Sequence, residues 1–165
     1  MSIFLSLYIS SMSRSIWGPA TWYLLHCMVL KIDDNIQRPV LEDLKNIIYV
    51  VISNLPCPMC SNHAVAYFGA HQYIRISTLE QLRFFIYSFH EDVNKRLKKT
   101  SALSYAEHVL YYQPFNLSMV IKNVIQIYEN MNNTNVTMMM YSFHRRRMVS
   151  DLDQYFRKHA ALYRA

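Results

Sequence analysis

The chain has 165 residues, of which 52% are hydrophobic, and a net charge of +6. This length fits one domain with a core of its own and an appendage. Only two glycines and three cysteines are present, which argues against a glycine-rich nucleotide-binding loop, a turn-rich β fold and a secreted disulfide framework. Because much of the positive charge falls in residues 143–165, we do not expect the domain to bind nucleic acid.

The N-terminus carries one apolar run, from Ile3 to Ile9. It is too short to span a membrane, and no basic residue precedes it as in a signal peptide. We therefore interpret residues 1–16 as a leader and expect neither a membrane span nor a secretory signal.

Apolar residues at helical spacing predict five helices in the first part of the chain. Pro19 and Pro39 stand near the starts of the first two, where proline is tolerated. Gly69 is expected just past the end of the third, and Thr78 with Gln81 resembles the capping box of the fourth. No segment alternates with a period of two, so the prediction is an all-α fold, a four-helix bundle with a short fifth helix. The predicted helices are 17–30, 39–55, 58–68, 78–97 and 104–112.

A C-terminal helical extension follows. Residues 117–131 are predicted to form an amphipathic helix, 130–140 a linker rich in Asn, Thr and Met, and 151–163 a last helix with basic side chains. The predicted organisation is a leader at 1–16, a domain at 17–113 and the extension at 114–165.

The strongest chemical signal is Cys57-Pro58-Met59-Cys60. Two cysteines at this spacing come within bonding distance when the second lies in the first turn of a helix. The free amides of that turn stabilise a thiolate, which raises reactivity. His63 follows one turn later on the same face. This layout is typical of a redox-active dithiol with an imidazole beside it.

Cys-x-x-Cys is also half of a zinc site. The alternative is therefore a zinc-binding helical interaction module that uses Cys57, Cys60 and His63, with His26 or His90 as the fourth ligand. A helical scaffold with incidental cysteines is a third possibility. Cys27, alone on its predicted helix, is interpreted as a buried small side chain.

Three motifs occur together: Trp22-x-x-x-His26, Cys57-x-x-Cys60-x-x-His63 and His90-x-x-Val93-Asn94-x-x-Leu97-x-Lys99. In this order they resemble the Erv/ALR family of FAD-linked sulfhydryl oxidases, most of all the small members encoded by large cytoplasmic DNA viruses. The resemblance extends from about Trp17 to Tyr112. The chain departs from the family pattern at Pro19, where arginine is usual, and at Glu91, where asparagine is usual.

The resemblance implies an FAD-dependent thiol oxidase that passes electrons from protein thiols through the Cys-x-x-Cys pair and FAD to dioxygen, giving hydrogen peroxide. It makes Cys57 the outer sulfur, attacked by the substrate thiol, and Cys60 the inner sulfur, facing the flavin. No metal is expected. The implied cofactor-binding residues are Gly18, Trp22, His26, His90, Val93, Asn94, Leu97, Lys99 and Tyr105.

Many family members carry a second cysteine pair in a flexible tail, whereas this sequence has no cysteine after Cys60. The expected partners are therefore dioxygen and either protein dithiols directly or a small Cys-x-x-Cys carrier protein. The resemblance also implies a homodimer. For a viral member it implies the host cytoplasm and the virion, with the mitochondrial intermembrane space as the weaker alternative.

Overall fold

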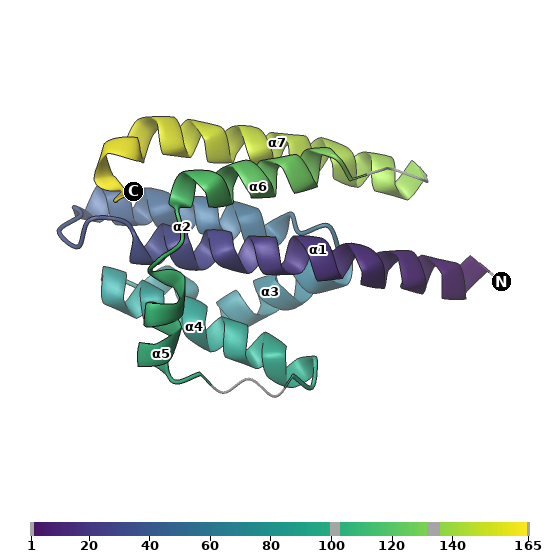
Figure 1. Ribbon diagram of the computed structural model, residues 1–165, viewed down its shortest axis with the longest axis horizontal. Coiled ribbons are helices and arrows are strands. Elements are labelled where there is room, and N and C mark those ends of the chain that lie inside the picture. The colour runs from purple at the N-terminus through teal and green to yellow at the C-terminus, as the bar shows by residue number, and fades with distance from the viewer. Residues whose placement is uncertain (1, 100–102, 132–135, 165) are drawn as a thin grey trace.

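The computed structural model describes the backbone of residues 2–99, 103–131 and 136–164, and the side chains of these except residues 2–13 and 136–141. Within these ranges the chain forms seven α-helices and two short 3-10 helices, with no β-strand (Figure 1). The predicted all-α fold is confirmed. The helices are α1 (Ser2–Leu30), α2 (Arg38–Ser53), α3 (Pro58–Ala70), η1 (Tyr73–Arg75), α4 (Leu79–Arg96), α5 (Tyr105–Tyr112), α6 (Leu117–Glu129), α7 (Val136–His159) and η2 (Ala160–Leu162).

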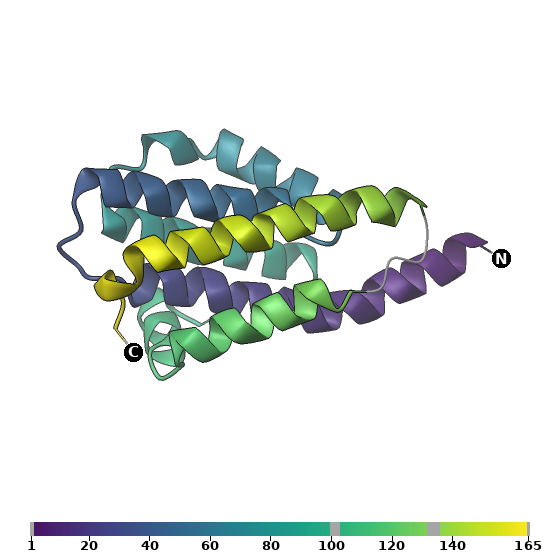
Figure 2. The ribbon, with the colours of Figure 1, turned by 90° about the horizontal axis from the view of Figure 1, so that it is seen from above.

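Helix α1 runs through the middle of the molecule. It packs against α4, α5 and α6, whereas α2 packs against α3 and α7. In Figure 1, α6 and α7 lie above α1, and α4 and α5 lie below it. Figure 2 shows α7 between α2 and α6, and both views show the first turns of α1 projecting beyond the bundle. No described helix has both the length and the apolar character needed to cross a membrane.

The core lies where the apolar stripes of the helices meet. Burying side chains of this size contributes about 1.5–3 kcal/mol each, so this shared interior is the main stabilising feature of the bundle. Buried side chains of the extension belong to it, from α6 as well as α7, so both helices are part of the same core. The largest fully buried side chains include Leu24 and Met28 of α1, Ile48 of α2, Leu82 and Ile86 of α4, and Met148 and Leu152 of α7.

The predicted start of the first helix was wrong. Helix α1 begins at Ser2, so residues 2–16 are helical, and Pro19 lies inside the helix. A proline there removes one backbone N–H donor and crowds the residue before it. That residue is Gly18, which has no Cβ to collide with the proline ring. The Gly18-Pro19 pair therefore explains how the helix continues to Leu30.

Helix ends follow the sequence in two places and differ in a third. Thr78 is the N-cap of α4 and forms a capping box with Gln81 in the first turn. Ser104 does the same for α5 with Glu107. The prediction for Gly69 was wrong: it lies inside α3, and Gln72 instead adopts the left-handed conformation beyond the helix, with φ 56°.

The C-terminal extension is more helical than predicted. Helix α6 matches its predicted range closely, but Val136–Met140 belongs to α7, so that part of the predicted linker was wrong. Residues 132–135 of the linker lie outside the described residues. The predicted helix at 151–163 is the second half of α7 followed by η2. Basic side chains of this segment pair with the domain: Lys158 of α7 with Asp43, and Arg164, just past the predicted helix, with Asp34.

Candidate functional site

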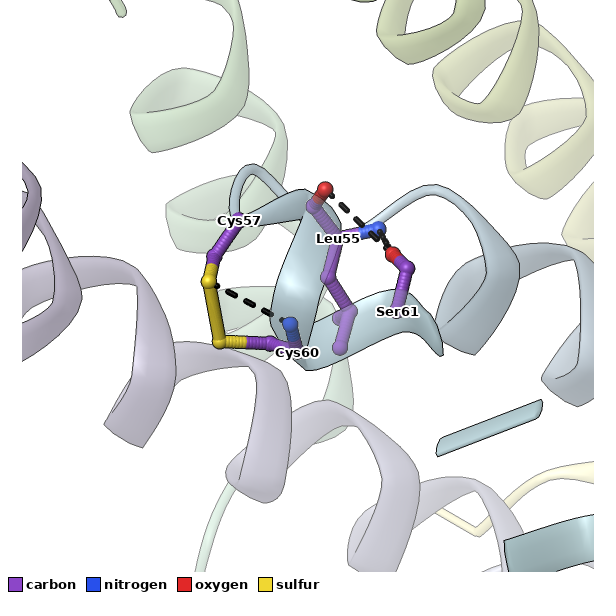
Figure 3. The surroundings of a disulfide bond; sticks show 4 residues. All are labelled: Leu55, Cys57, Cys60 and Ser61. Carbon is purple, nitrogen blue, oxygen red and sulfur yellow. Dashed lines mark hydrogen bonds between the residues drawn. A yellow bond between two sulfur atoms is a disulfide. The ribbon is translucent and has the colours of Figure 1, made fainter. Parts of the chain in front are cut away.

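Cys57 and Cys60 form a disulfide at the N-terminus of α3, with their Cα atoms 5.1 Å apart (Figure 3). Cys57 is the N-cap residue of the helix, and the backbone N–H of Cys60 donates a hydrogen bond to its Sγ at 3.3 Å. Pro58 begins the helix, where its missing N–H costs nothing. Both cysteines are half-buried against the core, whereas Met59 between them is 81% exposed. The disulfide is thus held at a helix end that solvent reaches from one side.

The loop before the disulfide is fixed by Ser61. Its hydroxyl accepts a hydrogen bond from the backbone N–H of Leu55 at 2.9 Å (Figure 3). Since Ser61 is itself buried in the first turn of α3, this bond closes the turn that carries Pro56 and Cys57. The sulfur of Cys57 is therefore positioned by the backbone on both sides.

His63 lies one turn after Cys60. Its Nε2 is 3.1 Å from Oδ2 of Asp92 on α4, and its ring is 6.1 Å from that of Phe89. Neither Phe89 nor Asp92 was predicted from the sequence to be a site residue. The pair joins the helix that carries the disulfide to the helix that carries His90.

Aromatic rings continue from α3 to α1. The ring of Phe89 lies 5.1 Å from Tyr67 of α3 and 5.3 Å from Trp22 of α1. Trp22 in turn stacks on His90, with ring centroids 3.9 Å apart and planes within 10°. Planar side chains therefore connect the elements that carry the first, second and third motifs.

Three histidines meet behind Trp22. Nε2 of His26 lies 2.9 Å from Nδ1 of His90, and Nδ1 of His26 lies 2.8 Å from Nε2 of His108 on α5. His26 and His90 were expected at one site, but His108 was not assigned a role. Its only signal in the sequence is its place one turn after Tyr105, and the contact depends on how α5 packs against α1.

Burial keeps these imidazoles uncharged. It lowers the pKa of His26, which is 1% exposed, well below the ordinary value, and the neighbouring imidazoles lower it further. Burial, followed by the neighbouring imidazole of His108 and the charge of Lys99, lowers the pKa of His90 to about 3. Burial alone lowers the pKa of His108 to about 4. All three rings are therefore neutral at pH 7.

The third motif lies at the end of α4. Asn94 is buried and donates a hydrogen bond to Glu91 at 3.2 Å. Beyond the helix, Lys98 takes the left-handed conformation, with φ 53°, and the backbone N–H of Lys99 bonds the carbonyl of Asn94 at 3.0 Å. This is a Schellman end, which turns the chain back so that the charge of Lys99 acts on His90.

The other predicted cofactor residues are spread along the same helices. Val93 packs partly against the core, and Leu97 is largely exposed at the C-cap of α4. Gly18 lies one turn before Trp22, and a Cβ built on it would lie 4.0 Å from Cγ of Arg14.

Tyr105 lies at the opposite end of α4. Its hydroxyl donates to Glu80 at 2.9 Å, and its ring contacts Phe84 and Tyr87. Glu80 precedes Asn94 by about 21 Å along a helix, so these contacts do not bring Tyr105 to the Asn94 end.

Cys27 is fully buried and free, and burial raises the pKa of its thiol to about 11. This agrees with its interpretation as a packed side chain. The zinc site of the alternative interpretation is not formed, because two of its ligands, Cys57 and Cys60, are bonded to each other. Among the described residues, the group close enough to hold a metal ion is His26, His90 and His108, without either cysteine.

The fold and the site define an all-α protein with a Cys-x-x-Cys disulfide at a helix N-terminus. A sequence profile of the Erv1 / Alr family matches residues 19–112, so the chain belongs to that family. No solved structure showed a significant match.

The relatives that align with this chain include viral proteins. It is 31% identical to a protein of Invertebrate iridescent virus 3 over 64% of this chain and 72% of the relative. It is 29% identical to the FAD-linked sulfhydryl oxidase of a Malawi tick isolate of African swine fever virus, over 63% of this chain and 86% of the relative. It is 30% identical to the protein of the same name from a Kenyan pig isolate, over 59% and 80%.

Proposed function

We propose that this chain is an FAD-dependent thiol oxidase, which forms disulfide bonds in protein thiols. The observation that carries the proposal is the half-buried Cys57–Cys60 disulfide at the start of α3. It lies on the same helix as Tyr67, from which ring contacts lead through Phe89 to Trp22. The names of the African swine fever virus relatives support the same activity.

The chemistry of the residues present fits FAD. A flavin nucleotide combines flat apolar rings with a diphosphate. Trp22 and His90 offer stacked planar faces, buried Asn94 offers an amide, and exposed Lys99 offers a cation for the phosphates. When bound, FAD supplies a two-electron acceptor that dioxygen reoxidises, with hydrogen peroxide as the product.

The chain itself performs thiol–disulfide exchange. A substrate thiolate attacks Sγ of Cys57, the Cys57–Cys60 bond breaks, and Cys60 leaves as a thiolate. The second substrate thiol then attacks the mixed disulfide and releases Cys57. The substrate loses two electrons and two protons as its disulfide forms, and the protein pair gains them as two thiols.

The release of Cys57 in the second step has a physical basis. Its Sγ already accepts the N–H of Cys60 at the helix N-terminus, where backbone amides and the helix dipole stabilise a thiolate. Cys57 is therefore a good leaving group when the mixed disulfide is resolved. Exposed Met59 marks the side from which a substrate can approach.

The experiment is purification of the full chain and measurement of flavin absorbance, followed by oxygen consumption with a small dithiol. Stoichiometric FAD and oxygen uptake that requires both cysteines are expected. A colourless protein that holds stoichiometric zinc, with no oxygen uptake after FAD is added, would contradict the proposal and favour the zinc module.

A small Cys-x-x-Cys carrier is the partner that we favour. Both cysteines are half-buried, so a small or flexible partner reaches them more easily than a large folded substrate. Cys60→Ser leaves Cys57 able to hold a mixed disulfide, and mass spectrometry should identify one small carrier. Many large proteins trapped without a common carrier would show direct oxidation. The homodimer stays a prediction, which analytical ultracentrifugation can test.

A further inference from the structure

His108 ends a row of three hydrogen-bonded imidazoles that come from three different helices. His26 of α1 is the central ring: its Nδ1 lies 2.8 Å from Nε2 of His108 on α5, and its Nε2 lies 2.9 Å from Nδ1 of His90 on α4. Both distances are those of ordinary hydrogen bonds. His26 and His108 are buried, and His90 is half-buried.

Neutral rings in such a row constrain one another. A neutral imidazole has one N–H donor and one acceptor nitrogen. Because His26 uses both nitrogens, it must donate to one neighbour and accept from the other. The row therefore has two polarities: all three rings carry the proton on Nε2, or all three carry it on Nδ1.

The chemistry of histidine favours the first polarity, because Nε2–H is the more stable tautomer of a free neutral histidine. His108 then donates to Nδ1 of His26, and His26 donates to Nδ1 of His90. The nitrogen of His90 that remains for a partner outside the row is Nε2, and it carries a hydrogen.

The same geometry argues against a metal ion in this cluster. A metal ion needs ligand atoms that converge on one point at about 2.0–2.1 Å from it. Here the two nitrogens of His26 face different rings, so one of the two hydrogen bonds would have to break.

Ring contacts hold each imidazole in place. Trp22 stacks on His90 at 3.9 Å, Tyr112 stacks on His26 at 4.3 Å, and Tyr87 meets the edge of His108 at 5.0 Å. The orientations of His26 and His90 are therefore each supported by a stacked ring. What these apolar contacts do not determine is which nitrogen carries the proton.

We propose that His108 is a positioning residue for the FAD site: by donating Nε2–H to His26, it fixes the tautomer of His26 and makes His90 a hydrogen-bond donor toward the cofactor. The inference rests on the proposed function for its last step only. The row and its polarity are properties of the chain itself.

The first test is ¹⁵N NMR of histidine in the full chain, as purified and after removal of FAD. Long-range correlation spectra distinguish Nε2–H from Nδ1–H. We expect the Nε2–H tautomer at all three rings at pH 7. Nδ1–H at His26, or saturable binding of added Zn²⁺ that shifts all three rings at one equivalent, would overturn the inference.

The second test compares two substitutions of similar size. His108→Gln keeps an N–H donor for His26, whereas His108→Phe removes it. We expect His108→Phe to mix the tautomers of His26 and His90 and to raise the dissociation constant of FAD about tenfold, as for one buried hydrogen bond. His108→Gln should keep Nε2–H at both rings and bind FAD within about threefold of wild type. His144→Gln, on the exposed side of α7, is the control.

The outcomes separate the two proposals. If His108→Phe keeps both the tautomers and the FAD affinity of wild type, or if His108→Gln loses as much affinity as His108→Phe, His108 has no positioning role. If the wild-type chain binds no FAD, the proposed function fails, and the tautomers of the flavin-free chain still decide whether the row has the stated polarity.

Discussion

The hydroxyl oxygens of Thr21 and Tyr128 lie 2.7 Å apart and join α1 to α6. The single hydroxyl hydrogen of Thr21 bonds the carbonyl of Trp17 at 2.8 Å, so Tyr128 must be the donor between the two. Both side chains are buried. The bond therefore ties the C-terminal extension to the helix that carries Trp22 and His26.

Removing the acceptor of this bond should lower the unfolding free energy more than removing the donor. Thr21→Val leaves the buried Tyr128 hydroxyl without its acceptor and should cost about 1–3 kcal/mol of unfolding free energy. Tyr128→Phe removes the donor, and Thr21 keeps its bond to Trp17, so the cost should be about 0.5–1.5 kcal/mol. Urea denaturation measures both. A larger loss for Tyr128→Phe would contradict this assignment of the donor.

The redox pair gives a second prediction. Cys57→Ser and Cys60→Ser should each abolish thiol oxidation while FAD stays bound, because each sulfur is required for exchange but neither supplies much of the cofactor surface. Turnover is measured as oxygen consumption and FAD content by absorbance. Cys27→Ala is the control, since Cys27 is buried and outside the pair. Equal inactivity of Cys27→Ala would show that the electron path includes a third thiol.

The bundle could be predicted because its signals are local. Apolar spacing gave the approximate ranges of α2 to α6, and Thr78 with Gln81 marked the start of α4 as it stands in the structure. Helix α7 was predicted too short, because Asn and Thr at 132–137 outweighed the three methionines at 138–140, which are good helix formers. Gly69 was wrongly predicted to follow the end of α3, because Gln72 is the residue that adopts the left-handed conformation there.

Only those site residues that belong to a sequence motif could be predicted. His108, Phe89 and Tyr112 contact motif residues, yet each is an ordinary residue of an amphipathic helix in the sequence. Their roles depend on how α4 and α5 pack against α1, and this packing produces no local pattern in the sequence. Tyr105 is a different case: the family resemblance, not a local pattern, placed it at the cofactor, and that role stays a prediction beside the observed bond from its hydroxyl to Glu80.

The end of α4 gives a prediction on FAD affinity. Asn94→Leu removes a buried amide, and Lys99→Glu replaces a cation by an anion at the proposed phosphate end. Each should weaken FAD binding by about 1–3 kcal/mol, the range for a charge-assisted hydrogen bond. Equilibrium dialysis measures the dissociation constants. Lys122→Glu, an exposed change on α6, controls for net charge. Flavin retention equal to wild type in both variants would refute the placement.

The histidine row predicts how stability depends on pH. The pKa values of His26, His90 and His108 are lowered in the folded chain, whereas unfolded histidine titrates near 6.5. Below about pH 6.5 the unfolded state therefore binds more protons, and the stability present at pH 7 is lost as the pH falls. Each histidine contributes a slope of up to about 1.4 kcal/mol per pH unit.

The measurement is the unfolding free energy of the flavin-free chain between pH 7 and pH 5. In wild type the row contributes up to about 4 kcal/mol per pH unit below the unfolded pKa. His108→Gln removes one titrating ring and should reduce the slope by about 1.4 kcal/mol per pH unit, whatever it does to the stability at pH 7. An unchanged slope would mean that His108 is protonated in the folded chain.

The last prediction concerns the turn that positions Lys99. Lys98 lies at C′ of α4 with φ 53°, a conformation that costs a residue with a Cβ about 1–2 kcal/mol and costs glycine almost nothing. Part of that gain is offset because glycine has more freedom in the unfolded chain. Lys98→Gly should therefore raise the unfolding free energy by about 0.5–1 kcal/mol. The matched change Lys95→Gly, one turn earlier within the helix, should lower it by about 0.5–1 kcal/mol. Both are read from urea midpoints at equal m-values. A loss of stability in Lys98→Gly would mean that the side chain of Lys98 makes a contact worth more than the backbone strain.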